Sequence, residues 1–441
     1  MILATRPAST PLLGELTPPG DKSISHRALI FGCLAQGQSR VAGLLESEDV
    51  RATASACRQL GMGMRQEQGT LVLEGVGAAG LSRPQSPLEM GNSGTAMRLL
   101  AGVLAAQPFD SELRGDESLS RRPMTRIVKP LTMMGGRIET AAGGTPPLRI
   151  SGNPDLQGID YLSPIASAQV KSCLLLAGLY ATACTTVTEP LKSRDHTEKM
   201  LPAFGVRLQG ACGVKGGSRL TGASVQVPAD ISSAAFFLVA AAMVPGSDLL
   251  LRNVGLNKTR DGIIHVLQAM GADLSILDRR RQGGEDAGDI RIRYSGRLKG
   301  IEIPLELIPS LIDELPVILA LAAVAEGTTI VRGAAELRVK ESDRLAVMAR
   351  GLATLGVSLL ECEDGIDIQG GEIKGGRVDG SGDHRCAMSF AILGQAAGAE
   401  VLVEGSENID TSYPSFVRDL SRTGGSVRVV QGDSVNVRKR A

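Results

Sequence analysis

Charged and polar residues stand at the start of six separate apolar segments, where a wholly buried helix has no use for them. A helix N-terminus carries unpaired N–H groups and a partial positive charge, so it attracts anions. Lys and Arg at the same place make phosphate and carboxylate the expected ligands. The six groups are Lys22, Ser23 and Arg27; Asn92, Ser93, Gly94 and Arg98; Ser167, Ala168, Gln169 and Lys171; Asp230, Ser232 and Ser233; Asp313 and Glu314; and Asp383, His384 and Arg385.

A purely structural role competes with this interpretation at several positions. Ser93, Asp230 and Ser232 are residue types that cap helices, although capping explains neither Lys22 nor Arg27. The string LRVKESDRL supplies Arg338, Lys340, Glu341 and Arg344, and Glu341 with Arg344 could form an ordinary ion pair on a solvated helix face. The clusters SRRPM and SRDHTEK could likewise face solvent. The residues alone leave both interpretations open.

A weak internal repeat predicts how these residues are positioned. Six amphipathic helical stretches end in a glycine before a β-like segment, and neighbouring glycines are 74, 70, 66, 85 and 68 residues apart. Glycine adopts the left-handed conformation that ends a helix without a Cβ penalty. Spacing this regular indicates one supersecondary unit used six times. The glycines are Gly61, Gly135, Gly205, Gly271, Gly356 and Gly424.

A second, almost uniformly apolar helix is expected in each unit, and such helices are normally buried. Sequences typical of β-strands, such as TTVTEP and GTTIVRGA, follow most of these helices. The unit therefore reads strand, buried helix, strand, surface helix, strand, with three copies in each half and a boundary near Val227 to Ile231. The polar helix starts of the two halves would then face each other across an anion-binding cleft. The apolar helices are predicted at 25–37, 94–106, 168–181, 232–244, 313–327 and 384–398.

The composition narrows the class of protein. Forty-seven basic residues balance 47 acidic ones, and aromatic residues make up 2% of the 441, which argues against a nucleic-acid or anionic-membrane partner. Seven cysteines without a C-x-x-C pair indicate free thiols in a reducing compartment. No signal peptide is recognisable, and the longest apolar run is too short to cross a bilayer. We expect a soluble cytoplasmic protein. Neither a nucleotide-binding loop nor a metal-binding motif is present, so no metal is expected.

Eight strings, in this order along the chain, resemble the 5-enolpyruvylshikimate-3-phosphate (EPSP) synthase family: PGDKSISHRALI, GNSGTAMRLL, SRRPM, ASAQVKSCLLLAGL, SRDHTEKML, LIDELPV, LRVKESDRL and GDHRCAMSFAI. The strings ASAQVKS and SRDHTEKM are similar to the bacterial branch called class II. The resemblance implies an α/β fold of two inside-out α/β barrels, each of three βαβαββ repeats. It implies one domain of residues 21–229 and a second of residues 1–20 plus 230–441.

The resemblance also implies roles for individual residues in transferring the enolpyruvyl group of phosphoenolpyruvate to the 5-hydroxyl of shikimate 3-phosphate. Asp313 would be the base, Glu341 the acid, and Lys22 would assist the departing phosphate. It further implies a monomer without cofactor. The shikimate 3-phosphate side would comprise Lys22, Ser23, Arg27, Ser167, Ala168, Gln169, Arg194, Asp313 and Lys340, and the phosphoenolpyruvate side Lys22, Gly94, Arg122, Gln169, Glu341, Arg344 and Arg385.

Two positions bear on variation within the family. Some class II members carry Ala at the position of Gly94 and tolerate the inhibitor glyphosate, so Gly94 predicts ordinary sensitivity. Some members place a Lys shortly before the C-terminal aromatic-Pro pair; here the stretch reads IDTSYPSF, with Thr411 in that place. No C-terminal lysine is therefore expected to assist phosphoenolpyruvate binding.

Three other functions are compatible with parts of this pattern. UDP-N-acetylglucosamine enolpyruvyl transferases generally use a mobile-loop Cys, and the corresponding loop LRGDESLSRRPM contains none. RNA 3′-phosphate cyclases share the repeat unit, but the balanced charge and the few aromatics disfavour a nucleic-acid substrate. A non-catalytic anion-binding protein would have no need of Asp313 and Glu341, because carboxylates weaken anion binding.

Overall fold

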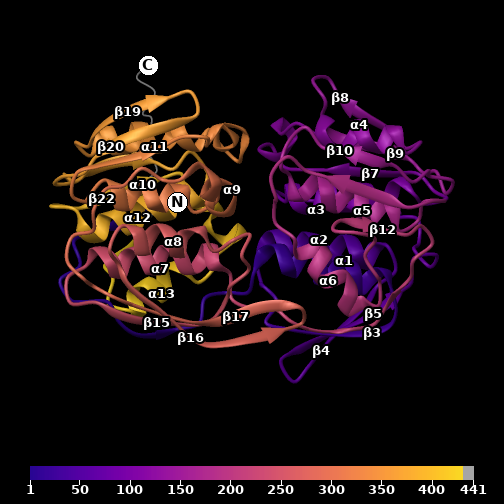
Figure 1. Ribbon diagram of the computed structural model, residues 1–441, viewed down its shortest axis with the longest axis horizontal. Helices are drawn as coiled ribbons and strands as arrows, with labels where there is room; N and C mark the ends of the chain where they lie inside the picture. The colour runs from indigo at the N-terminus through magenta and orange to yellow at the C-terminus, as the bar shows by residue number, and fades with distance from the viewer. Residues whose placement is uncertain (431–441) are drawn as a thin grey trace, which may run out of the picture.

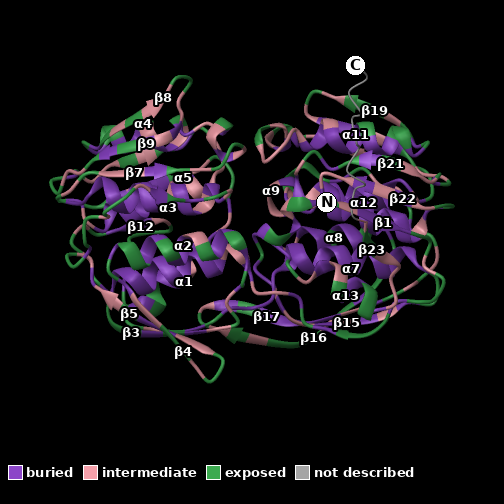
Figure 2. Cartoon of the chain, turned by 180° about the vertical axis from the view of Figure 1, so that it is seen from behind, coloured by how far each residue is buried: buried purple, intermediate pink, exposed green. Residues whose placement is uncertain are grey.

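The computed structural model describes residues 1–430 of this chain, and its helices belong to two alternating series. The helices of the first series are largely buried, as the purple colour in Figure 2 shows. All six predicted apolar helices are therefore confirmed. Its members are α1 (Lys22–Leu34), α3 (Gly94–Ala105), α5 (Ala168–Gly178), α7 (Ile231–Met243), α10 (Leu315–Ala322) and α12 (His384–Leu393). The second series is α2 (Glu48–Gln59), α4 (Thr125–Met133), α6 (His196–Met200), α8 (Gly262–Ala269), α11 (Arg344–Thr354) and α13 (Phe416–Arg422), with the short α9 (Ile308–Leu311) before α10.

The six predicted glycine stops are confirmed, since every one of them has a positive φ, between +84° and +110°. The third is the least regular. There α6 ends at Met200 and a 3₁₀ turn, η2 (Leu201–Phe204), leads to Gly205. Pro202 lies in that turn, and a proline cannot donate the backbone hydrogen bond that would continue an α-helix. The predicted longer helix is therefore divided into two short ones.

In residues 1–430 the strands form six small sheets, five of them mixed and one, formed by residues 328–331, 358–362 and 365–369, antiparallel. Three contain β3 (Ala35–Ala42), β4 (Gly63–Glu67), β5 (Thr70–Val76), β13 (Leu220–Thr221) and β14 (Ser224–Gln226); β6 (Leu88–Glu89), β7 (Ser111–Arg114), β8 (Arg137–Ala141) and β9 (Thr145–Ser151); and β10 (Asp160–Leu162), β11 (Thr185–Thr188) and β12 (Gly213–Val214). The others contain β2 (Leu13–Leu16), β15 (Asp248–Gly255), β16 (Asp273–Gln282) and β17 (Glu285–Arg293); β18 (Thr328–Val331), β19 (Ser358–Cys362) and β20 (Gly365–Gln369); and β1 (Ile2–Thr5), β21 (Gly376–Asp379), β22 (Val401–Glu404) and β23 (Val427–Val430).

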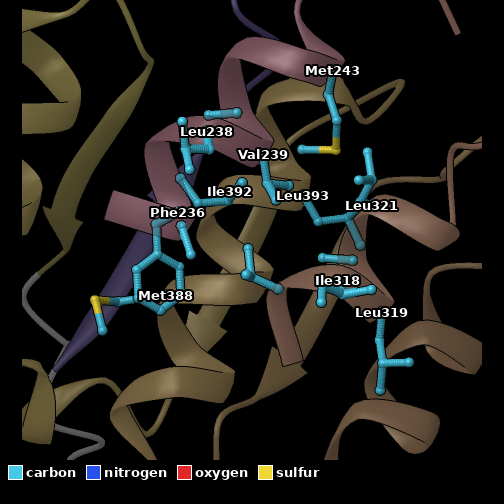
Figure 3. Close-up of a cluster of buried hydrophobic side chains, with 14 of the residues drawn as sticks. Phe236, Leu238, Val239, Met243, Ile318, Leu319, Leu321, Met388, Ile392 and Leu393 are labelled. Atoms are coloured by element: carbon cyan, nitrogen blue, oxygen red, sulfur yellow. The ribbon is translucent and has the colours of Figure 1, made fainter. Parts of the chain in front are cut away.

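The buried apolar side chains form two separate clusters. One draws on residues 24–227, and we refer to the part of the chain around it as the first lobe. The other draws on residues 3–16 and 231–420, and the part around it is the second lobe. Figure 1 shows the two lobes side by side. Figure 3 shows side chains of α7, α10 and α12 packed together in the second core.

The chain crosses twice between the lobes, because its N-terminal strands belong to the second lobe. β1 pairs with β22 and β23, and β2 pairs with β15. The two crossing segments run beside each other, with Asp21 N–H donating to Pro228 O at 2.8 Å and Asp230 N–H donating to Pro19 O at 2.8 Å. Among residues 1–430, no helix has both the length and the apolar character required to cross a bilayer.

Candidate active site between the lobes

The N-terminal ends of the buried helices meet at a cavity of about 390 Å³ between the lobes. It is lined by eight Lys or Arg residues and five Asp or Glu residues, so its wall carries an excess of positive charge. Within residues 1–430 no group of His, Cys, Asp and Glu side chains is arranged to hold a metal ion. The charged residues of the wall are Lys22, Arg98, Arg122, Arg126, Arg194, Arg260, Lys340 and Arg385, with Asp49, Asp230, Asp313, Glu336 and Glu341.

Side-chain caps prepare several of these helix ends. Ser93 Oγ accepts the N–H of Ala96 at 3.1 Å, and Asp230 Oδ1 accepts the N–H of Ser232 at 2.8 Å. Capping is therefore a real role of Ser93 and Asp230. Ser232 is not a cap, because its hydroxyl accepts from Arg260 at 2.6 Å and donates to Glu314.

Asp313 lies where cations of both lobes converge. Its carboxylate contacts Arg194 of the first lobe, and Arg344 Nη1 and Arg385 Nη2 approach it to 3.2 and 3.7 Å. Burial raises the pKa of this carboxyl group, but Arg194, Arg385, Lys340 and Arg344 outweigh burial and hold the pKa well below its usual range. Asp313 is thus ionised in the unliganded protein and able to accept a proton.

Glu341 is the second carboxylate of the cavity. Arg344 Nη2 lies 2.5 Å from one oxygen, and Arg122 Nη1 of the first lobe lies 3.5 Å from the other. Burial raises the pKa of Glu341, yet Arg344, Arg122 and His384 together hold it well below the usual value. The expected pair between Glu341 and Arg344 exists, but Arg344 is only 1% exposed, so it is not a solvated surface pair.

Three separate groups of contacts hold polar side chains of the first lobe at the cavity. Gln169 accepts from Arg98 at 2.5 Å and donates to Thr95 Oγ1 at 2.9 Å. Arg122 donates to the side-chain oxygen of Asn92 at 2.5 Å, and Lys22 Nζ lies 2.5 Å from Asp49. An incoming anion would therefore compete with Asn92 for Arg122 and with Asp49 for Lys22.

Two predicted site residues lie one layer behind the wall. Arg27 is buried and donates to Thr197 Oγ1 at 2.8 Å, to Ser172 Oγ at 2.7 Å and to the carbonyl of Ser23. Burial lowers its pKa to about 10. Arg344 reaches both Asp313 and Glu341 from below, and its Nε donates to Asp383 at 2.8 Å. All other predicted site residues line the cavity.

The wall also contains residues that the sequence did not single out. Asp49 lies in the first turn of α2, and Arg260 contacts Asp21 and Asp230 beside the crossing segments. Arg126 and Glu336 form a half-exposed ion pair of 2.8 Å across the cleft. No local pattern distinguishes these residues from surface charges, and only the juxtaposition of the lobes reveals them. Thr411 is buried, and its hydroxyl donates to Asn408 O.

A sequence model of the family described as EPSP synthase (3-phosphoshikimate 1-carboxyvinyltransferase) matches residues 7–420. The chain belongs to the EPSP synthase family. It is 54% identical over 411 residues to the 3-phosphoshikimate 1-carboxyvinyltransferase of Xanthomonas campestris pv. campestris (strain B100), covering 92% of this chain and 94% of that one. It is 54% identical over 424 residues to the enzyme of the same name from Halorhodospira halophila, covering 95% of each.

A solved structure of EPSP synthase from Acinetobacter baumannii superposes on this chain with a TM-score of 0.87 at 48% identity, covering 98% of this chain and all of that one. The family resemblance predicted from the eight strings is thus confirmed, and with it the mixed α/β fold and the enzyme class. Enzymes of the EPSP synthase family transfer an enolpyruvyl group from phosphoenolpyruvate to shikimate 3-phosphate.

Proposed function

We propose that this cavity transfers the enolpyruvyl group of phosphoenolpyruvate to the 5-hydroxyl of shikimate 3-phosphate and releases phosphate. The observation that carries the proposal is the placement of two carboxylates, Asp313 and Glu341, within a wall rich in Lys and Arg. The two substrates together bring two phosphates and two carboxylates, and Arg can pair with both kinds of group through two hydrogen bonds.

Shikimate 3-phosphate occupies the side of the cavity formed by α5 and the Arg194 loop. The N–H groups of Ala168 and Gln169 are in the first turn of α5, where they have no intrahelical partner. They and the hydroxyls of Ser23 and Ser167 face the phosphate. Asp313 and Lys340 cover the ring from the second lobe, and Arg27 supports Ser23 from behind.

Phosphoenolpyruvate occupies the side formed by the N-terminus of α3 and the second lobe. Lys22, Arg122 and Gln169 approach from the first lobe, and Arg385 approaches from the second. Arg344 acts from beneath the wall by holding Glu341. Gly94 leaves room at this point, because a Cβ there would lie 3.0 Å from Arg98 Nη1 and 3.4 Å from Arg122 Nη1.

The chemistry is addition followed by elimination. Asp313 takes the proton of the 5-hydroxyl as its oxygen bonds to C2 of phosphoenolpyruvate, and Glu341 delivers a proton to the methylene carbon. The tetrahedral intermediate then loses phosphate, assisted by Lys22, while Glu341, which is now deprotonated, takes a proton from the methyl group and the double bond is restored. Substrate anions compete for the cations that now hold both carboxylate pKa values down, so binding raises those pKa values toward the range useful for proton transfer.

The wider organisation belongs to the same proposal. Residues 21–229 form one inside-out α/β barrel of three βαβαββ repeats, and residues 1–20 plus 230–441 form the other, of which 431–441 lie outside the described residues. The domains close on the substrates and exclude water from the intermediate. The enzyme acts as a monomer of the class II-like branch, without a cofactor. All seven cysteines are free thiols, which supports a cytoplasmic location.

Glyphosate is expected to compete with phosphoenolpyruvate in the submillimolar range, because Gly94 leaves the inhibitor uncrowded. Indifference to the inhibitor would contradict this part of the proposal.

Phosphate release tests the proposed function. The purified protein is given phosphoenolpyruvate with shikimate 3-phosphate or, in parallel, with UDP-N-acetylglucosamine. Release that requires shikimate 3-phosphate is the expected result. Release only with the nucleotide sugar would overturn the acceptor, and release with neither would overturn the activity.

A further inference from the structure

A buried charge cluster lies directly behind the shikimate 3-phosphate side of the cavity. Lys171 of α5 places Nζ 2.9 Å from Glu189 Oε2 and 2.8 Å from Glu198 Oε1. The three side chains are only 3, 7 and 9% exposed. None of them lines the cavity. We define Lys171, Glu189 and Glu198 as the rear cluster.

Glu189 uses its remaining lone pairs on two segments of the cavity wall. Its Oε1 accepts the N–H of Ser167 at 2.8 Å and the hydroxyl of Ser193 at 2.7 Å. Its Oε2 accepts the N–H of Ser193 at 3.3 Å. Ser167 is the N-cap of α5, and Ser193 immediately precedes Arg194. One carboxylate therefore joins a helix start to an arginine loop.

The two joined segments present different donors to the same space. The α5 segment offers the free N–H groups of Ala168 and Gln169, and the loop offers the guanidinium of Arg194. Hydrogen-bond recognition tolerates errors of only a few tenths of an ångström. The separation of these donors must therefore be fixed by rigid contacts, and Glu189 contacts Ser167 of one segment and Ser193 of the other directly.

Electrostatics explain why a lysine accompanies this glutamate. Two carboxylates behind an anion site repel the anion, and Lys171 offsets one of their two negative charges. Burial lowers the pKa of Lys171, but Glu198 and Glu189 outweigh burial and raise it, so Lys171 is charged. Buried ion pairs add little net stability compared with apolar replacements. The cluster is thus better explained by the geometry that it imposes than by stability.

We propose that Glu189 and Lys171 are positioning residues for the acceptor substrate: Glu189 sets the distance between the start of α5 and Arg194, and Lys171 holds Glu189 in place. This inference rests on the proposed function. Glu189 and Lys171 touch no substrate, yet they contribute to binding of the acceptor phosphate and not to binding of phosphoenolpyruvate.

Glu189→Gln is the sharpest test. It keeps the size and one accepting oxygen, but its NH₂ group cannot accept from Lys171 or from Ser193. Hydrogen bonds to charged groups typically correspond to about 10- to 100-fold in an equilibrium, so KM for shikimate 3-phosphate should rise at least about tenfold. KM for phosphoenolpyruvate and kcat at saturation should stay within about threefold on the same grounds. Glu139→Gln, on exposed β8, is the matched control and should change neither constant.

Three further variants keep the test decisive. In Lys171→Met, Glu189 and Glu198 lose their cation, and adding Glu189→Gln should raise the apparent Tm above that of the single variant. Ser193→Ala leaves the rear cluster intact and should raise KM for shikimate 3-phosphate by a smaller factor, so it serves if Glu189→Gln does not fold. Calorimetric titration with shikimate 3-phosphate alone should show the same loss of affinity as the kinetics.

The inference is overturned if Glu189→Gln lowers Tm while KM for shikimate 3-phosphate stays unchanged, or if both KM values rise together. A wild-type protein without acceptor-dependent phosphate release would instead overturn the proposed function. The two failures are therefore separable.

Discussion

Replacing Asp313 with asparagine removes a proton acceptor from the centre of the cavity while nearly preserving its shape. General-base catalysis typically contributes 10²- to 10⁴-fold, so kcat should fall by about that factor, or about 2.7–5.4 kcal/mol in activation free energy. KM should change much less than kcat. The Asp313 carboxylate competes with the anionic substrates for Arg194 and Arg385, so its removal does not weaken the contacts of the substrates with these two cations. We expect KM for either substrate to stay within about threefold.

The folded protein should tolerate this change. Buried Arg344 loses one carboxylate contact but keeps Glu341 at 2.5 Å and Asp383 at 2.8 Å. The assay is steady-state phosphate release at varied substrate concentrations, with Tm measured on the same preparations. Asp410→Asn, an exposed position in the second lobe, is the matched control. A kcat within about fivefold of wild type, or a loss confined to KM, would refute the assignment of Asp313 as the base.

Three further changes test other features of the cavity and its supports. Gly94→Ala places a Cβ 3.0 Å from Arg98 Nη1; it should weaken glyphosate more than phosphoenolpyruvate in competition kinetics, and equal weakening would contradict this. Burial, with Lys22 and Arg27 nearby, holds the pKa of His26 well below its usual value. As pH falls below about 6.5, His26 is therefore protonated in the unfolded chain but not in the folded one, and the free energy of unfolding drops by up to about 1.4 kcal/mol per pH unit. Between pH 7 and 5.5 the Tm of His26→Gln should fall less than that of wild type, whereas the Tm of exposed His265→Gln should fall as much as that of wild type. Glu336→Gln removes a half-exposed ion pair and should change unfolding stability by less than about 1 kcal/mol, and a larger loss in a denaturant titration would show that the pair is not solvent-screened.

The repeat was predictable because its signals are local. Glycine after an amphipathic helix and a helix without a polar face are both properties of short windows, and all six of each are present in the structure. The third surface helix was the exception. Pro202 divides this helix, and the prediction missed the division because it followed the apolar periodicity and did not take the proline into account.

Whether an individual site residue lines the cavity or lies behind its wall was not predictable from the sequence. Arg27 and Arg344 carry the same side chain as Arg122 and Arg385, yet the first two lie behind the wall and the latter two line it. Their position depends on which helix packs beneath which, and that information is non-local. Arg126 and Asp49 were missed for the same reason, since each resembles an ordinary surface charge in its own segment.

Product analysis in D₂O tests the central claim most directly. Phosphoenolpyruvate labelled with ¹³C is turned over with shikimate 3-phosphate, and the products are observed by NMR. The account predicts an enol ether on the 5-oxygen, formed together with phosphate, with deuterium in its methylene group because the intermediate carries a freely rotating methyl. Pyruvate as the product would contradict transfer, and an enol ether without deuterium would contradict protonation of the methylene carbon by Glu341.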